Sequence, residues 1–94
     1  MTIAKSTMRF SLGSLYITAG AKESIPAKEV FAAIGRHLRC DWGDVGEQDW
    51  MLNDEACAGI GRLLSSYRTT SGIRFWIITD YGHEVTTILL PSEY

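Results

Sequence analysis

The chain has 94 residues, of which 46% are hydrophobic, and a formal net charge of −2 at pH 7. That length fits a single domain over residues 1–94 with material for one core, and no window approaches the roughly 18 apolar residues of a membrane span. Two cysteines, Cys40 and Cys57, exclude a disulfide framework in a chain without an export signal, so we expect a cytoplasmic protein with reduced thiols and no cofactor.

The first predicted element is a strand over Ser6–Thr18, in which apolar residues alternate with other residues. Phe10 and Leu12 share one face, and Gly13 breaks the run or marks a bulge. The residues from Ala19 to Ile25 predict a turn or a single helical turn.

A helix is predicted next, from about Pro26 to Arg39. Pro26 suits a first helical position, and Ser24 just upstream could satisfy free amides. The predicted core-facing stripe, at helical spacing, consists of Val30, Phe31, Ile34, His37 and Leu38.

A second helix is predicted from the segment Asp44-Val45-Gly46-Glu47, which has the spacing of a capping box. It runs to about Gly59 or Gly61, and its apolar stripe is narrow. We therefore expect this helix to lie at the edge of the sheet.

Three strands in a meander close the chain, over Arg62–Arg68, Ile73–Asp80 and Val85–Leu90. Glycines at the two intervening turns favour tight hairpins, and the middle strand is apolar on both faces, as a central strand should be. The predicted fold class is α+β: an antiparallel sheet of four strands, in the order β-α-α-β-β-β, with two helices packed on one face.

The span from Cys40 to Gly61 contains no Lys or Arg and carries six acidic residues and two tryptophans. Tryptophan anchors with a carboxylate rim suit a protein-binding surface; the alternative is that the tryptophans are core and the acids only solubilise the fold. The predicted partner-binding residues are Asp41, Trp42, Asp44, Glu47, Asp49, Trp50, Asp54 and Glu55. Asp41 and Asp44 match no metal-binding signature, so turn formation and capping are preferred and no metal is expected.

An alternative basic site consists of Arg62, Arg68, Arg74 and His83, which could share one face or end of the sheet and contact RNA or a phosphate. Direct nucleic-acid binding is not expected, because three scattered arginines also describe an ordinary solvated edge and the overall balance is acidic. His37 is interpreted as a structural histidine of the core stripe. No nucleophile motif surrounds the serines or cysteines.

Several blocks of sequence resemble a family of small, functionally uncharacterised bacterial proteins, called hypothetical or plasmid-related, that are found on mobile elements. The similarity covers about Ser11 to the C-terminus, and its blocks are Asp41-Trp42-Gly43-Asp44, Arg62-Leu63-Leu64-Ser65 with Tyr67, Trp76-Ile77-Ile78-Thr79, and Thr86 to Pro91 with Glu93-Tyr94. The family usually has glycine at the position of Cys40, and Glu-Ala-Asp-Arg-Ser where this chain has Asp80-Tyr81-Gly82-His83-Glu84. The resemblance implies that the gene lies on a mobile element, and it implies no mechanism.

Three functions follow as hypotheses. The preferred one is a non-enzymatic macromolecule-binding protein of a mobile element, such as an anti-CRISPR or anti-restriction inhibitor, that acts on a protein or nucleoprotein complex through the acidic, tryptophan-containing surface. The first alternative is a small nuclease or hydrolase, similar to the mRNA-interferase toxins, that uses Arg62, Arg74 and His83. The second alternative is a structural or regulatory homo-oligomer.

Overall fold

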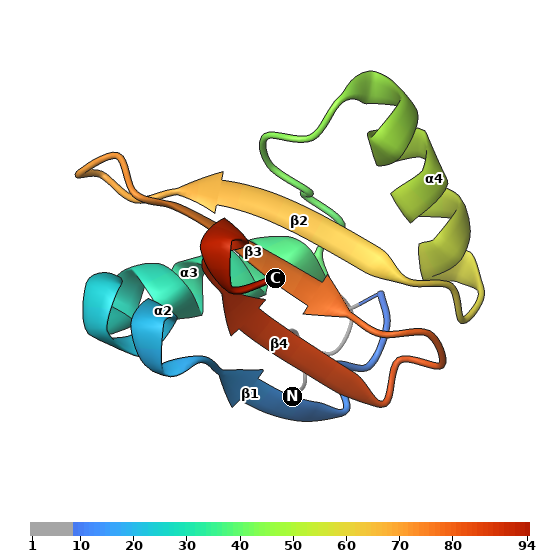
Figure 1. Ribbon diagram of the computed structural model, residues 1–94. Helices are drawn as coiled ribbons and strands as arrows, with labels where there is room; N and C mark the ends of the chain where they lie inside the picture. The colour runs from blue at the N-terminus through green and yellow to red at the C-terminus, as the bar shows by residue number, and fades with distance from the viewer. Residues whose placement is uncertain (1–8) are drawn as a thin grey trace, which may run out of the picture.

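The computed structural model describes residues 9–94 and contains one four-stranded sheet with helices around it (Figure 1). The strand order is β1-β4-β3-β2. The α+β class is confirmed. The elements are β1 (Ser14–Ile17), α2 (Ala19–Ser24), α3 (Ala27–Leu38), α4 (Glu47–Ala58), β2 (Leu63–Arg68), β3 (Arg74–Thr79), β4 (Val85–Leu89) and a short 3₁₀ turn, η1 (Pro91–Glu93).

The C-terminal meander forms as predicted. Strands β2 and β3 pair antiparallel with Ser65 opposite Ile77, and β3 pairs antiparallel with β4 with Ile77 opposite Ile88. Strand β3 therefore lies inside the sheet, and its Ile77 and Ile78 are both buried.

Strand β1 departs from the prediction in length and in direction. It covers Ser14–Ile17 instead of Ser6–Thr18, and residues 6–8 of the predicted strand lie outside the described residues. It pairs with β4 in parallel, which makes the sheet mixed rather than antiparallel. Because α2, α3 and α4 separate β1 from the meander, no hairpin turn dictates its direction.

Helix α2 begins at Ala19, as expected, and α3 begins one residue later than expected. The region 19–25 forms the six-residue α2, whose Ala21 N–H donates to the Thr18 hydroxyl over 3.2 Å. Helix α3 begins at Ala27, so Pro26 is its N-cap, and no side chain caps it. Its buried residues are Val30, Ala33 and His37.

The sheet has two different faces. On the helix face lies the core cluster, and α3 lies behind the sheet in the view of Figure 1. The core consists of Ala21, Ile25, Val30, Ala33, Tyr67, Phe75, Ile77 and Ile88. Over the other face, here called the C-terminal face, the chain end folds back so that Tyr94 meets Trp76 edge to face with ring centroids 5.7 Å apart.

Helix α4 stands beyond β2 at the edge of the sheet, as predicted (Figure 1). The predicted capping box is wrong: α4 begins at Glu47, its N-cap is Gly46, and no side chain caps it. Asp44 contacts β2 instead, where its N–H donates to the Ser66 carbonyl over 2.7 Å. Within residues 9–94, no helix has the length and apolar character needed to cross a membrane.

Candidate functional site

The predicted acidic, tryptophan-containing surface is divided by the fold. Trp42 has 0% exposure, and its ring lies against Phe10 and His37. Its indole N–H donates to the Asp54 carboxylate over 2.9 Å. Trp42 is therefore a core residue and cannot anchor a partner at the surface, whereas Trp50 is half-buried.

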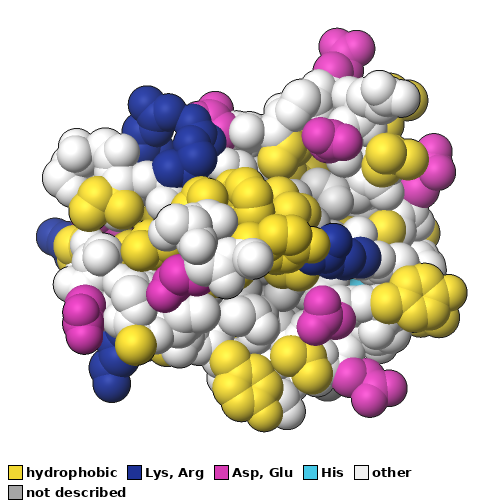
Figure 2. Space-filling model, in the orientation of Figure 1, with side chains coloured by type: hydrophobic (Ala, Val, Ile, Leu, Met, Phe, Trp, Pro, Cys, Tyr) yellow, Lys and Arg dark blue, Asp and Glu magenta, His cyan; other side chains and the backbone are white. Residues whose placement is uncertain are grey.

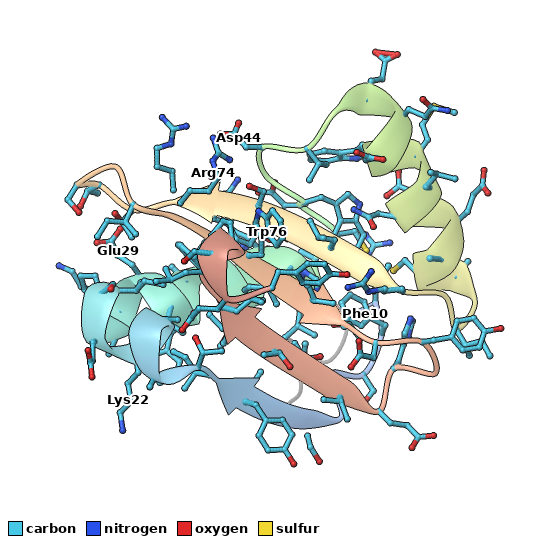
Figure 3. The ribbon with its side chains drawn as sticks, viewed as in Figure 1. Phe10, Lys22, Glu29, Asp44, Arg74 and Trp76 are labelled. Carbon is cyan, nitrogen blue, oxygen red and sulfur yellow. The ribbon has the colours of Figure 1, made fainter. Side chains whose placement is uncertain are left out.

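The two aspartates that flank Trp42 also make intramolecular contacts. Asp41 accepts from Arg36 over 2.7 and 3.2 Å, and it accepts the Gly43 N–H over 3.3 Å, which completes the expected Asx turn. The Arg36 guanidinium lowers the pKa of the Asp41 carboxyl below its usual value. Asp44 lies 3.5 Å from the Arg74 guanidinium, and Figure 3 shows the two side chains together above β2.

The remaining acids of the predicted site belong to α4 and face solvent. Glu47, Met51 and Glu55 follow one another at four-residue spacing on the side of the helix away from Asn53, which is the buried residue among the twelve of α4. Met51 is 59% exposed. We call this the outer face of α4; Asp54 and the 56%-exposed Leu52 flank it, and Asp49 is exposed on the side of the helix that carries Asn53.

The C-terminal face of the sheet brings together three of the four residues of the predicted basic site. Arg68 and Arg74 are cross-strand partners, and Arg62 donates to the Tyr94 hydroxyl over 2.6 Å with its guanidinium 5.3 Å from the ring centroid. Figure 2 shows an apolar area at the centre of this face with Lys or Arg side chains on two sides of it.

His83, the fourth predicted basic residue, makes different contacts. It lies in the turn before β4, where its Nε2 is 2.8 Å from the Gly61 carbonyl oxygen and its ring lies 5.4 Å from that of Phe10.

Sequence reasoning missed two aromatic residues of the C-terminal face. Trp76 and Tyr94 lie between the arginines, and Trp76 is placed at the centre of this face in Figure 3. The signal for Trp76 was its alternation with Arg74 along β3, which assigns both side chains to one face. No pattern in the sequence indicated that η1 would bring Tyr94 back over the sheet.

A chain of hydrogen bonds crosses the helix face beneath α3. The Thr86 hydroxyl donates to the Leu12 carbonyl over 2.7 Å, so Thr79 must donate to Thr86 and must itself accept from the Nε2–H of His37. His37 Nδ1 is then unprotonated and accepts from the Ser65 hydroxyl over 2.5 Å. Burial, together with the nearby His83, lowers the pKa of His37 to about 3.

The His37–Ser65 pair resembles a nucleophile and its base in geometry. Both residues have 0% exposure, however, so a substrate cannot reach the hydroxyl without opening the core. Among residues 9–94, no buried side-chain nitrogen or oxygen lacks a hydrogen-bond partner. The pair is therefore part of the hydrogen-bonded core, as the interpretation of His37 as a structural histidine expected.

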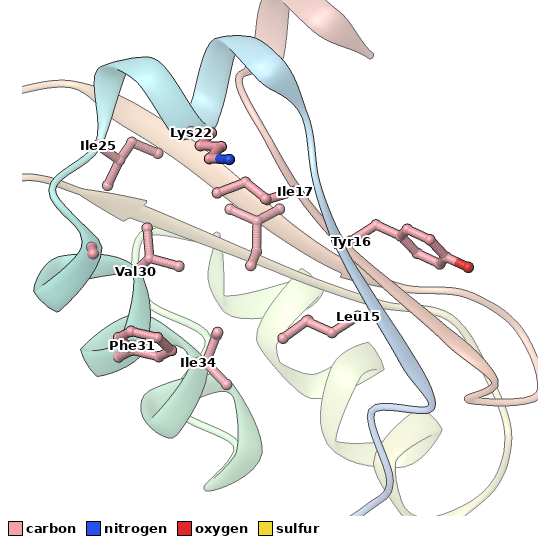
Figure 4. Close-up of a pocket in the computed structure, with 10 residues that line it drawn as sticks. Leu15, Tyr16, Ile17, Lys22, Ile25, Val30, Phe31 and Ile34 are labelled. Atoms are coloured by element: carbon pink, nitrogen blue, oxygen red, sulfur yellow. The ribbon is translucent and has the colours of Figure 1, made fainter.

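An apolar groove of about 430 Å³ lies between β1, α2 and α3 (Figure 4). Leu15 and Ile17 form one wall, Phe31 and Ile34 the other, and Lys22 reaches over it. Phe31 is 70% exposed, which corrects its assignment to the core stripe. Residues three and four apart share a helix face, so Phe31 and Ile34 lie together at the groove. The fold buries the face that carries Val30 and His37 instead.

The chain matches no family model, no curated protein and no solved structure with which it was compared. These comparisons therefore supply no functional assignment. Of the predicted residues, the structure gathers the exposed acids of α4 on one helix and the three arginines on one sheet face, and it removes Trp42 from the surface.

Proposed function

We propose that this chain is a non-enzymatic macromolecule-binding protein whose binding surface is the outer face of α4. One observation carries the proposal: α4 turns Glu47 and Glu55 into solvent together with the large apolar side chains of Met51 and Leu52. A helix that only covered the edge of the sheet would have no need to expose two such side chains. Exposed apolar side chains with a charged rim are typical of interaction surfaces.

The partner chemistry follows from charge. No Lys or Arg lies between Cys40 and Gly61, so the acids of α4 have no cation on their own helix and attract a basic surface. Basic surfaces of nucleoprotein complexes normally hold phosphates, and a carboxylate-bearing helix can occupy such a surface. The resemblance to proteins of mobile elements favours a cytoplasmic inhibitor of host defence, of the anti-CRISPR or anti-restriction type.

The test mixes the purified protein with CRISPR effector or restriction complexes and measures co-elution and DNA binding by those complexes. A triple variant, Glu47→Gln, Asp49→Asn and Glu55→Gln, removes three charges from α4. A matched control, Glu23→Gln, Asp80→Asn and Glu84→Gln, removes three exposed charges elsewhere.

We expect the wild type and the control to co-elute with a complex and reduce its DNA binding, with an association rate that falls as salt rises. The α4 variant should lose both effects. Failure of the wild type to bind any complex would overturn the inhibitor assignment, and equal binding by the two triple variants would overturn the role of α4.

A second candidate function is contact with RNA or another polyanion at the C-terminal face. It is favoured by the gathering of Arg62, Arg68 and Arg74 around Trp76 and Tyr94, because arginines and aromatic rings on a sheet suit single-stranded RNA. The enzyme alternative uses Arg62 and Arg74 with His83, and it predicts growth arrest on expression that His83→Ala or Arg74→Ala abolishes. Binding of single-stranded RNA that is insensitive to Arg62→Gln and Arg68→Gln would count against this face.

A further inference from the structure

The thiols of Cys40 and Cys57 face each other with their sulfur atoms 2.9 Å apart. Cys40 follows the C-terminal end of α3, in the left-handed region with φ 66°, and Cys57 lies in the last turn of α4. Both residues are half-buried. A surface pocket of about 440 Å³, lined by both cysteines with Arg9 and Asp54, gives small molecules access to the sulfurs.

We propose that Cys40 and Cys57 form an oxidisable pair, closing an intramolecular disulfide between the end of α3 and α4 when the protein meets a peroxide. The sulfur atoms are within about 1 Å of the 2.03–2.05 Å of a disulfide bond. A movement of about 1 Å therefore brings the two sulfur atoms to bonding distance.

Other contacts hold the two sulfur atoms in place without a covalent bond. The N–H of Cys40 donates to the His37 carbonyl over 3.0 Å, which fixes the end of α3. On the other side, Asn53 bonds α4 to the main chain of Leu64, and Asp54 bonds it to Trp42. The reduced protein is thus already arranged for the reaction.

The chemistry balances with hydrogen peroxide as the oxidant. The Cys57 thiolate attacks one peroxide oxygen, the O–O bond breaks, and the leaving hydroxide takes up a proton to become water. The Cys40 thiol then displaces the hydroxyl of the Cys57 sulfenic acid as a second water, and the S–S bond forms. The two thiols lose two hydrogens and two electrons, and the peroxide gains them.

The order of the two steps follows from the environment of Cys40. Burial, with a smaller contribution from its hydrogen bond to Cys57, raises the pKa of the Cys40 thiol to about 12. The raised pKa disfavours the Cys40 thiolate, so Cys40 is assigned as the second thiol. Since the thiolate is the nucleophile, the rate of closure should rise with pH.

The bond would close a loop of 17 residues that contains the whole acidic segment up to Cys57. A cross-link over such a loop restricts the unfolded chain and stabilises the fold. This consequence goes beyond the proposed function, because it fixes α4 to the body whether or not its outer face binds a partner.

The experiment treats the folded protein with hydrogen peroxide, then denatures it without reductant and measures intact mass, alkylatable thiols and linked peptides. We expect a monomer that has lost two hydrogens, both thiols protected, and a peptide pair joined through Cys40 and Cys57. The oxidised protein should melt about 10 °C or more above the reduced one, and dithiothreitol should reverse the shift.

Cys40→Ser and Cys57→Ser serve as matched controls, each of which should lack the linked peptides and the shift in melting temperature. Links between two molecules only, two free thiols after oxidation, or a sulfinic acid at Cys57 would each overturn the proposal. A linked protein that melts below the reduced form would also overturn it, because the bond would then not fit the folded geometry.

Discussion

The outward-facing main-chain groups of the two edge strands, β2 and β1, differ in their hydrogen bonding. On β2, Asn53 accepts from the Leu64 N–H and donates to the Leu64 carbonyl, while Trp42 and Asp44 bond the N–H and carbonyl of Ser66. At β1, the Ser14 N–H donates to the Glu84 carbonyl just before β4, and the Thr18 N–H just after β1 donates to the Ile88 carbonyl. The main-chain groups of Leu15 and Ile17 therefore point away from the sheet. In the sheet formed by residues 9–94, β1 is one edge strand and β2 is the other.

This difference explains much of the acidic segment. An uncovered edge strand invites pairing with other chains, and proteins cover such edges with loops, helices or charge. The loop at Trp42–Asp44 and helix α4 cover β2. This covering accounts for the burial of Trp42 and Asn53. Strand β1 has only four residues, and its shortness limits the same hazard.

The largest effect should come from the hydrogen-bond chain that joins β2 to the segment before β1. The folded-state pKa of His37 is about 3, below the 6.5 of the unfolded chain. Its contribution to stability is therefore complete above pH 6.5 and is lost as the pH falls towards 3. The free energy of unfolding should fall by up to about 1.4 kcal/mol per pH unit, on the order of 4 kcal/mol in total.

Urea unfolding at several pH values between 6.5 and 4.5 measures this slope above the range in which most carboxyl groups titrate. The His83→Gln variant should keep the slope, and His37→Gln should flatten it. NMR provides a second measurement that needs no variant: the imidazole of His37 should show no protonation above about pH 4. A His37 titration near pH 6.5 would contradict the prediction.

The next effect concerns the close approach of the covering loop to β2. Gly43 has φ 75°, and a Cβ there would lie 2.2 Å from the Ser66 carbonyl oxygen. Gly43→Ala should therefore cost about 3 kcal/mol or more, since it combines an unfavourable backbone conformation with the displacement of the loop. Gly72→Ala is the control, because Gly72 has φ 94° and open space around it, and should cost about 1 kcal/mol. Equal losses, measured by chemical denaturation, would mean that the loop can move without cost.

The sequence predicted the meander because its information is local. Alternation along Leu63–Arg68 and the turn glycine at Gly72 determine strands and hairpin together. The parallel pairing of β1 with β4 joins segments separated by three helices and two strands, and no local pattern encodes it. Asp44 has the right spacing for a capping box, but its N–H is taken by Ser66, a contact formed only in the folded chain.

The candidate site follows the same rule. The exposure of Glu47, Met51 and Glu55 could be derived from helical spacing once a buried position, Asn53, was known. The burial of Trp42 depends on packing against Phe10, which is distant in sequence, so composition alone could not separate an anchor from a core residue.

A smaller effect is expected from the amide that covers β2. Asn53→Ala leaves the N–H and carbonyl of Leu64 without their partners and should cost about 2 kcal/mol. Gln48→Ala removes an exposed amide from the same helix and should change stability by less than about 0.5 kcal/mol. Protection of the Leu64 amide against hydrogen exchange should fall in the Asn53 variant. Unchanged protection there would show that α4 covers this edge by other contacts.

The smallest effect should be found on β1, and one matched pair of leucines compares the two edges directly. Leu63 on β2 has 0% exposure, and Leu15 on β1 has 46%, although both side chains belong to the helix face. Leu63→Ala should cost about 3 kcal/mol, as large-to-small core substitutions do. Leu15→Ala should cost less than about 1 kcal/mol, because nearly half of that side chain already contacts solvent at the groove. Chemical denaturation at low protein concentration measures both. A loss at Leu15 as large as that at Leu63 would show that the groove side of β1 is covered in solution, and the contrast between the two edges would then disappear.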